Sequence, residues 1–483
     1  MSKHFTIVAG TIAALLLAAG LIYAGPWFRI EPIWISLGVI LIPIAVFLIR
    51  KYPALPLVGL LFVGNYKTQP AEGISLMDPT LIVAVLLALA TGWELLLILG
   101  GISRVSLREV FLGQGRGVLA FLCFSGVLAI SCLYTLSPAS GADKLMRFAV
   151  FDMFAFFAPF FLLKKEEDFR RLASLVGVFA IPLAIRLIMG IMHPTEQQLL
   201  GNADVTQIGI AQSIGISALI MLYYRLPGRF GRLFAFTALP VLAVGLMASI
   251  ARGPILVLLL VVAMMTVMMP GQGIVSRKAL IAGVLVLAVV MGAALMWVGQ
   301  LPIAQNRGPG KMAELSALAH GTLDAGGTTS KRLEFYNSTI VAFVSNPLTG
   351  VGLAGWPAFY GDQTIPYPHN FVLEVAAEQG LPGLVALLAL LAGALSELLW
   401  LRKSKNEFTF VLPVFLYCIF SNLVSNGIEN RVLFFWIGAA FLAGRMAKQK
   451  EGQPLAAPVA LPTSKLPVYL DTATQRVRMA GWK

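Results

Sequence analysis

The hydrophobic positions of this chain form long runs that are separated by short polar segments. A helix needs about 20 mostly apolar residues to cross a bilayer, because no water is present there to satisfy its backbone amides. Runs of suitable length predict membrane-spanning helices at 5–24, 33–49, 80–100, 118–134, 148–163, 172–192, 208–223, 233–250, 254–269, 279–298, 382–400, 408–424 and 432–447. A shorter run at 55–66 is either a tilted span or a half-crossing. The pattern therefore predicts about 12 to 14 membrane helices.

Composition supports the same fold class. Of the 483 residues, 58% are hydrophobic and only 12% are charged, whereas ordinary soluble domains carry about a quarter charged residues. The three cysteines, Cys123, Cys132 and Cys418, all lie inside apolar runs, so no disulfide or metal framework is expected. We therefore expect an all-α, polytopic helical bundle in a membrane rather than soluble domains.

The loops between the runs differ in their content of lysine and arginine. Short loops rich in these residues stay in the cytoplasm. The basic loops contain Arg50 and Lys51, Arg104, Arg108 and Arg116, Lys164 to Arg171, Arg225 to Arg232, Arg277 and Lys278, Arg402 to Lys405, and Arg445 to Lys450. If the 55–66 run is counted as a crossing, every second connection between spans is a basic loop, so all the basic loops fall on one side of the membrane. This favours about 14 spans with both termini cytoplasmic.

This sorting divides the chain into four parts. Residues 1–298 are expected to form N-terminal membrane helices, 299–380 a large outer loop, 381–448 the closing membrane helices, and 449–483 a flexible cytoplasmic tail. The net charge of +13 then reflects cytoplasmic loops that face anionic lipid headgroups. No basic stripe interleaved with aromatic residues occurs, so nucleic acid is not an expected partner.

The large loop contains a second kind of helical pattern. From Ser330 onward, Leu333, Ile340 and Phe343, joined by Tyr336, recur at helical spacing. This spacing predicts an amphipathic helix that lies on the membrane domain through these four side chains and ends before Asn346 and Pro347.

Several arginines are expected at outer helix ends, where the sorting rule disfavours them. These are Arg147, Arg252 and Arg431, together with Arg332 and its neighbour Lys331 in the large loop, and Arg186 within an apolar span. The simple interpretation is that each reaches lipid phosphates at the membrane surface. A tight turn from Ser249 to Pro254 weakens this interpretation for Arg252, since it fixes the guanidinium at the surface. If several of these arginines converge, they would form a site for a dianion, because guanidinium groups match phosphate oxygens.

His369 is the second exception to the pattern. It lies in Tyr367-Pro-His-Asn-Phe-Val-Leu-Glu374, just before the outer end of a span. Histidine is the side chain whose ordinary pKa suits a general base near neutral pH. A structural role is the alternative, and for the other three histidines it is the expected one.

Three segments of the chain form a recognisable set. They are Tyr367–Glu374, Glu378-Gln-Gly-Leu-Pro-Gly-Leu384 and Asn346-Pro-Leu-Thr-Gly-Val-Gly-Leu353. Together they resemble the O-antigen ligase and O-antigen polymerase superfamily. Arg332 at the head of the loop helix and Arg252 in Ser249-x-x-Arg-Gly253 resemble two further positions of the family. The resemblance implies a membrane-embedded glycosyltransferase with a GT-C-like fold in the bacterial inner membrane. Its active site would lie on the periplasmic side.

The resemblance also implies substrates and a mechanism. The donor would be a glycan on undecaprenyl pyrophosphate, and the acceptor a sugar hydroxyl on lipid A core or on another lipid-linked glycan. His369 would deprotonate that hydroxyl, and Arg252 and Arg332 would neutralise the departing pyrophosphate. The expected reaction is a single displacement that inverts the anomeric carbon, used in lipopolysaccharide or exopolysaccharide biosynthesis of the cell envelope.

Four further residues are assigned substrate-binding roles. Arg147 and Arg186 are expected to contact the diphosphate or the lipid. Asn370 and Glu374 are expected to orient the imidazole, although a helix cap and a solvated helix face explain them equally well.

No metal or other cofactor is expected. Metal-dependent enzymes of this fold class resemble one another in placing paired carboxylates in the first outer loop. Here that loop, residues 25–32, offers only Glu31, and no Asp-x-Asp sequence occurs in the chain. Mg²⁺ and Mn²⁺ favour such oxygen ligands.

Three other classes of protein are alternatives. A secondary transporter would use Glu94, Asp152, Arg186 and Glu397 as coupling residues, but no repeated halves are visible. A flippase for lipid-linked oligosaccharide would not need the large loop with its His-Asn pair, and a structural membrane subunit leaves the outer arginines unexplained. Within the enzyme class, ligase, polymerase and protein O-glycosyltransferase stay open.

Overall fold

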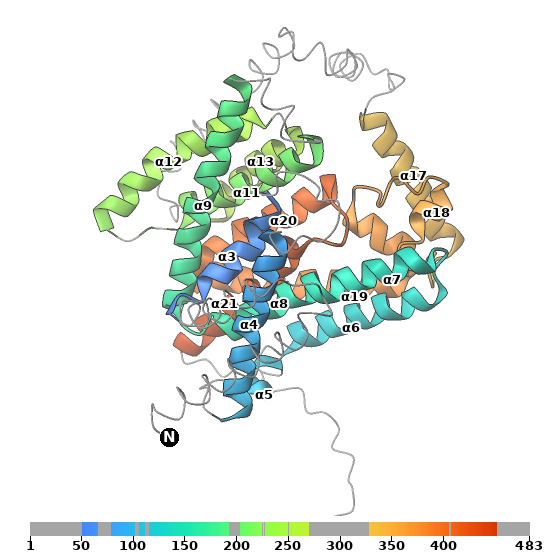
Figure 1. Ribbon diagram of the computed structural model, residues 1–483, viewed down its shortest axis with the longest axis horizontal. Helices are drawn as coiled ribbons and strands as arrows, with labels where there is room; N and C mark the ends of the chain where they lie inside the picture. The colour runs from blue at the N-terminus through green and yellow to red at the C-terminus, as the bar shows by residue number, and fades with distance from the viewer. Residues whose placement is uncertain are drawn as a thin grey trace, which may run out of the picture.

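The structure is a computed structural model, and it is helical throughout the part that it describes (Figure 1). That part comprises residues 51–65, 79–101, 106–111, 115–192, 203–224, 226, 228–249, 251–269, 328–404 and 407–451. Three predicted spans, at 5–24, 33–49 and 279–298, lie outside the described residues, as do the loop from 299 to 327 and the tail beyond 451.

The described helices keep the order that the apolar runs predict. They are α3 (Ala54–Phe62), α4 (Pro79–Leu99), α5 (Leu107–Phe111), α6 (Arg116–Ser131), α7 (Pro138–Arg147), α8 (Met153–Leu162), α9 (Glu166–Met192), α11 (Ala203–Tyr223), α12 (Gly228–Ala248), α13 (Arg252–Met268), α17 (Thr328–Ser345), α18 (Trp356–Tyr360), α19 (Phe371–Ser404), α20 (Val411–Ser425) and α21 (Arg431–Lys450). Short 3₁₀ turns are η1 (Val63–Asn65), η2 (Cys132–Tyr134) and η4 (Glu407–Phe410), and a π-turn, η3 (Phe148–Asp152), joins α7 to α8.

Many of these helices are suited to a bilayer. Among the described residues, 7 helical stretches are long and apolar enough to cross a membrane, and α3 with η1, α11 and α13 are shorter apolar helices. The prediction of an all-α, polytopic membrane protein is confirmed. The total of about 12 to 14 spans stays a prediction, because part of the chain lies outside the description.

Two helices extend further toward the predicted outer side than their apolar runs do. The span predicted at 148–163 is the second part of a continuous helical stretch from Pro138 to Leu162. α19 begins at Phe371, well before the span predicted at 382–400. Hydropathy misses both extensions because they carry charged side chains. Three of these, Lys144, Glu374 and Glu378, are buried against each other rather than solvated.

Close contacts between aromatic and small residues build the core of the bundle. α21 passes so near α8 that a Cβ placed on Gly438 would lie 2.2 Å from the carbonyl oxygen of Phe156. The rings of Phe121 and Phe156 stack with centroids 3.9 Å apart, and Phe434 packs edge-on to Phe121 at 5.8 Å. Lipid supplies no hydrophobic force between helices, so such close packing is what holds membrane helices together.

Contacts at the helix ends fall into two sets. The first set joins the predicted cytoplasmic ends, through Lys51 with Arg171, Glu94 with Lys164, Glu109 with Arg445, and Glu166 with Lys450. The second set joins the opposite ends, through Ser131 with Leu353, Arg147 with Glu429, Gln212 with Asn426, and His369 with Ser425. The helix ends that carry the basic loops thus contact one another, and the remaining ends contact one another at the opposite side of the bundle, as the loop charges predict. The side of the membrane that each set of ends faces stays a prediction.

The predicted loop helix exists, but it packs through a different face. α17 ends at Ser345, directly before Asn346 and Pro347, as predicted. Phe335, Thr339 and Ala342 are its buried residues, whereas Leu333 and Ile340 of the predicted face are exposed. The prediction of the face was wrong because it followed the aliphatic residues. The helix instead packs through the ring of Phe335, which lies edge-on to Trp356 with centroids 5.9 Å apart.

Candidate functional site

His369 lies in the short segment that connects α18 to α19. Its backbone has a φ of 62°, the left-handed conformation that non-glycine residues seldom adopt. The imidazole packs between the rings of Tyr367 and Phe335, with centroids 4.9 Å and 6.0 Å away. Its Nδ1 lies 3.3 Å from the backbone carbonyl oxygen of Ser425, at the end of α20. When Nδ1–H donates to this carbonyl, Nε2 carries a lone pair and can accept a proton.

The surroundings of His369 favour its neutral form. Burial lowers the pKa of the imidazole below its ordinary value, and the nearby positive charge of Arg332 lowers it further, while the hydrogen bond to the Ser425 carbonyl acts in the opposite direction. The net effect is a lowered pKa. A neutral imidazole near pH 7 is the form that a general base requires.

Arg332 reaches the same place from α17. It lies one turn before Tyr336. Burial raises the pKa values of Tyr336 and Tyr367 and lowers the pKa of His369, and the positive charge of Arg332 acts toward a lower pKa in all three groups. Phe335, three residues further along α17, is buried against Trp356 and His369. The aromatic packing of α17 therefore brings the Arg332 guanidinium near enough for its charge to act on the imidazole.

Arg252 approaches from the membrane domain as the first residue of α13. A Cβ placed on its neighbour Gly253 would lie 3.3 Å from Val424 Cγ1 and 3.4 Å from Ser425 Oγ. The turn before it is held by Ser249, whose hydroxyl accepts a hydrogen bond from the backbone N–H of Ala251 at 3.2 Å. The N-terminus of α13 adds its own partial positive charge at this point. Ser425 is thus the residue at which the segments carrying Arg252 and His369 meet.

Asn370 and Glu374 hold the beginning of α19. The Asn370 side chain accepts hydrogen bonds from the backbone N–H groups of Val372 and Leu373, both at 3.1 Å, and so caps the helix. Glu374 is buried and accepts from the backbone N–H of Ile428 at 2.8 Å. Their hydrogen bonds within the described residues go to these groups rather than to the imidazole. The position of Glu374 is also not the solvated helix face that the sequence offered as an alternative.

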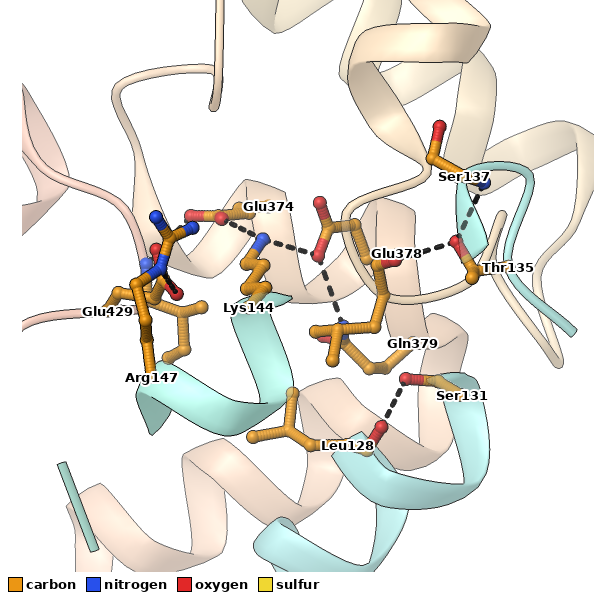
Figure 2. A network of polar contacts seen from close by, with 12 residues as sticks. Leu128, Ser131, Thr135, Ser137, Lys144, Arg147, Glu374, Glu378, Gln379 and Glu429 are labelled. Atoms are coloured by element: carbon orange, nitrogen blue, oxygen red, sulfur yellow. Dashed lines mark hydrogen bonds and ion pairs between the residues drawn. The ribbon is translucent and has the colours of Figure 1, made fainter. Parts of the chain in front are cut away.

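A buried ion cluster lies beside this segment (Figure 2). Lys144 on α7 places its Nζ 2.6 Å from Glu374 Oε1 and 2.7 Å from Glu378 Oε2, and its side chain is 5% exposed. Gln379 Nε2 donates to Glu378 Oε2 at 3.3 Å. Sequence reasoning gave Lys144 no role, because it lies outside the predicted span. The available signal was the spacing of Glu374 and Glu378, which places two carboxylates on one face of α19.

The two motif segments after α17 interlock through backbone hydrogen bonds. Pro382 has no N–H, so the Glu378 carbonyl lacks a helical partner and accepts from Gly352 N–H at 2.9 Å. Leu381 N–H turns to the Pro347 carbonyl at 2.7 Å, because Gly380 adopts a non-helical φ of 65°. The break in α19 thereby binds the segment 346–353 to α19, and Leu353 N–H donates separately to the Ser131 carbonyl at the end of α6, at 3.2 Å.

Arg147 and Arg186 have partners of their own. Arg147 is exposed and pairs with Asp143 at 3.2 Å and with Glu429 at 3.0 Å. Arg186 Nη1 lies 3.5 Å from the backbone oxygen of Asn65, a long hydrogen bond. The described contacts therefore link these two arginines to α7, to η1 and to the α20–α21 connection. By contrast, His369 and the segment carrying Arg252 meet at Ser425, and the charge of Arg332 acts on His369.

One protein family matches the chain. Its sequence model, described as O-antigen ligase, matches residues 235–388, which include Arg252, Arg332 and His369. No curated protein sequence matches the chain. The matched region is about a third of the length and runs from α12 through α17 and α18 into α19. Residues 235–388 are therefore similar to the O-antigen ligase family, as the motifs predict, and they lie in a multi-pass membrane protein.

Proposed function

We propose that this protein is a glycosyltransferase that moves a glycan from undecaprenyl pyrophosphate to a sugar hydroxyl at the periplasmic face of the bacterial inner membrane. The observation that supports the proposal is that His369 and the segment carrying Arg252 meet at Ser425, while the charge of Arg332 acts on the imidazole of His369. A neutral base beside guanidinium groups suits a reaction in which a hydroxyl loses a proton and a pyrophosphate departs.

The reaction is a single displacement. The acceptor oxygen forms a bond to the anomeric carbon as the bond from that carbon to the pyrophosphate oxygen breaks, with inversion. The hydroxyl proton passes to Nε2 of His369, whose other nitrogen is held by the Ser425 carbonyl. Arg332 and Arg252 stabilise the negative charge that grows on the pyrophosphate oxygen. Fixed cations provide this stabilisation without a metal ion, and we include metal independence in the proposal. The first outer loop, on which that expectation rests, lies outside the described residues.

The transporter alternative gains little support from the contacts of its candidate coupling residues. Glu94 pairs with Lys164, and Glu397 pairs with Lys448 at 2.7 Å. Both pairs lie at the end of the bundle opposite to His369, where they join neighbouring helices. Such pairing accounts for both carboxylates structurally.

The test is transfer by the purified protein in lipid nanodiscs. The donor is the undecaprenyl-pyrophosphate-linked glycan, offered with lipid A core in one reaction and alone in another, each with and without EDTA. One transfer to the core indicates a ligase, and a ladder of products indicates a polymerase. Absence of transfer in both reactions contradicts the proposal, and loss of transfer with EDTA that Mg²⁺ restores contradicts metal independence.

A further inference from the structure

A polar cavity lies within the bundle, between η1, α11, α20 and the start of α21. It has a volume of about 220 Å³. Its polar lining residues are Asn65, Gln212, Ser213, Tyr417, Ser421, Asn422, Glu429, Asn430 and Arg431. So many carboxamide and hydroxyl groups are costly inside a membrane domain unless water or a ligand satisfies them.

The wall is held in place by hydrogen bonds among its own carboxamides. Asn65 donates to Ser213 Oγ at 2.6 Å, and Asn430 donates to Asn422 Oδ1 at 2.7 Å. Gln212 uses only one end of its amide, since Oε1 accepts from Asn426 at 3.1 Å. Its Nε2 is buried and has no hydrogen-bond partner among the described residues. The Gln212 amide is therefore a preorganised donor in the wall that is left for an occupant.

The charge of the wall argues against an anion as the occupant. Glu429 and Arg431 are its charged members, one of each sign. Glu429 accepts from Arg147 at 3.0 Å, and the half-buried Arg431 guanidinium lies in the field of Asp152. A pyrophosphate gains little from a wall in which opposite charges balance. Sugar hydroxyls both donate and accept, and they match carboxamides and serine hydroxyls.

The cavity is next to the candidate site and limited in size. Ser421 and Asn422 lie one turn before Ser425, whose carbonyl holds His369. Asn426, the next residue, is the partner of Gln212. Pockets for drug-sized ligands begin at about 300 Å³, so 220 Å³ suits a single sugar ring rather than an oligosaccharide.

We infer that this cavity is a sugar-binding subsite that holds one monosaccharide unit through Gln212, Ser421 and their carboxamide neighbours. The inference rests on the proposed function, and it adds residues that determine which sugar is accepted. The sugar comes either from the donor, next to its pyrophosphate, or from the end of the acceptor. The same hydrogen-bonding chemistry serves both, so the experiment separates them.

The variants are Gln212→Leu, which removes the unpaired donor, and Ser421→Ala. Ser217→Ala is the matched control, because Ser217 is a buried serine of α11 that bonds to the Val176 carbonyl at 2.8 Å and lies outside the cavity wall. Binding of undecaprenyl pyrophosphate is measured with and without its glycan, together with KM for the acceptor. Thermal unfolding of each variant is recorded, and Gln212→Asn replaces Gln212→Leu if the latter does not fold.

If the donor sugar occupies the cavity, Gln212→Leu weakens binding of the glycan-bearing lipid about tenfold or more and leaves the bare lipid unaffected. Gln212→Asn gives a smaller loss in the same direction. If the acceptor sugar occupies the cavity, donor binding stays constant and the acceptor KM rises by a similar factor. Unchanged donor binding and acceptor KM in folded Gln212 and Ser421 variants overturn the subsite. A wild-type protein that transfers no glycan refutes the proposed function instead.

Discussion

The ammonium group of Lys144 lies 2.6 Å from the carboxylate of Glu374, although the two residues are 230 positions apart in the sequence. The other oxygen of the same carboxylate accepts from the backbone N–H of Ile428. One buried side chain thus joins α7, the beginning of α19 and the connection between α20 and α21. His369 and Ser425 lie a few residues from two of these attachment points. The cluster therefore fixes the relative positions of the two segments that hold the imidazole.

Removing the cation from this cluster should destabilise the protein strongly. Lys144→Met leaves two carboxylates buried without a counter-charge, and breaking a buried ion pair in this way costs about 3–5 kcal/mol. We expect a large fall in the thermal unfolding temperature in detergent. The triple variant Lys144→Met, Glu374→Gln, Glu378→Gln should recover part of it, because no unpaired charge then stays buried.

Lys448→Met is the matched control for that substitution. Lys448 pairs with Glu397 at 2.7 Å, but their side chains are 27% and 25% exposed. A pair with this access to solvent contributes about 1 kcal/mol or less. Equal losses at positions 144 and 448 would show that the buried cluster has no special role.

Gly352 should tolerate no side chain. Its φ is 83°, and an added Cβ would lie 2.2 Å from the Cα atom of Thr135, a backbone atom that cannot move aside. Gly361 has a φ of 90° but nothing within 4 Å of such a Cβ. Gly361→Ala should therefore cost only about 1–2 kcal/mol of left-handed strain, whereas Gly352→Ala should prevent folding. Size-exclusion profiles of the two purified variants compare them, and a monodisperse Gly352→Ala protein would contradict the close approach.

Long apolar runs predicted most of the described helices, because the bilayer demands length and hydrophobicity from each span. The same signal missed residues 138–147 of α7, where Lys144 makes the segment polar although it is buried. The hydrogen bond from the Gly352 N–H to the Glu378 carbonyl could not be predicted either, since backbone hydrogen bonds between distant segments leave no periodic pattern in the sequence. His369 and Arg332 stood out as exceptions to the loop-charge pattern and were given roles through motif resemblance, whereas the unpaired donor of Gln212 depends on three-dimensional packing alone.

The loop charges predict that the end of α17 and the end of α21 face opposite sides of the membrane. Ser345→Cys and Gln449→Cys place a thiol at exposed positions of these two helices, in a background without the three native cysteines. A membrane-impermeant maleimide added to intact spheroplasts should label position 345 only, and position 449 should react after permeabilisation. Labelling of both positions before permeabilisation would show that the assigned topology is wrong.

The pH dependence of transfer should reflect the lowered pKa of His369. A base works only when unprotonated, so kcat/KM should fall on the acidic side with an apparent pKa below the ordinary value of about 6.5 for histidine. Arg332→Gln removes a positive neighbour that opposes protonation of the imidazole. The acidic limb should then move to higher pH. Lys331→Gln, which removes an exposed charge from the adjacent position of α17, should leave the limb in place.

The last prediction separates the role of the base from that of the arginines. Asparagine replaces His369 in this test, because asparagine tolerates the left-handed backbone at that position better than alanine. His369→Asn should leave donor binding nearly intact and lower the single-turnover rate by about a hundredfold or more. Arg332→Ala and Arg252→Ala should weaken both donor binding and turnover, with a loss of about 2–4 kcal/mol of transition-state stabilisation each. Lysine at either position should restore only part of the lost donor binding and turnover, since an ammonium group cannot reproduce the forked contact of a guanidinium. Lys331→Ala, next to Arg332 on the same helix, should change neither quantity. A folded His369→Asn protein with a turnover rate close to that of the wild type would make His369 a structural histidine, and the base would then have to be another group near Ser425.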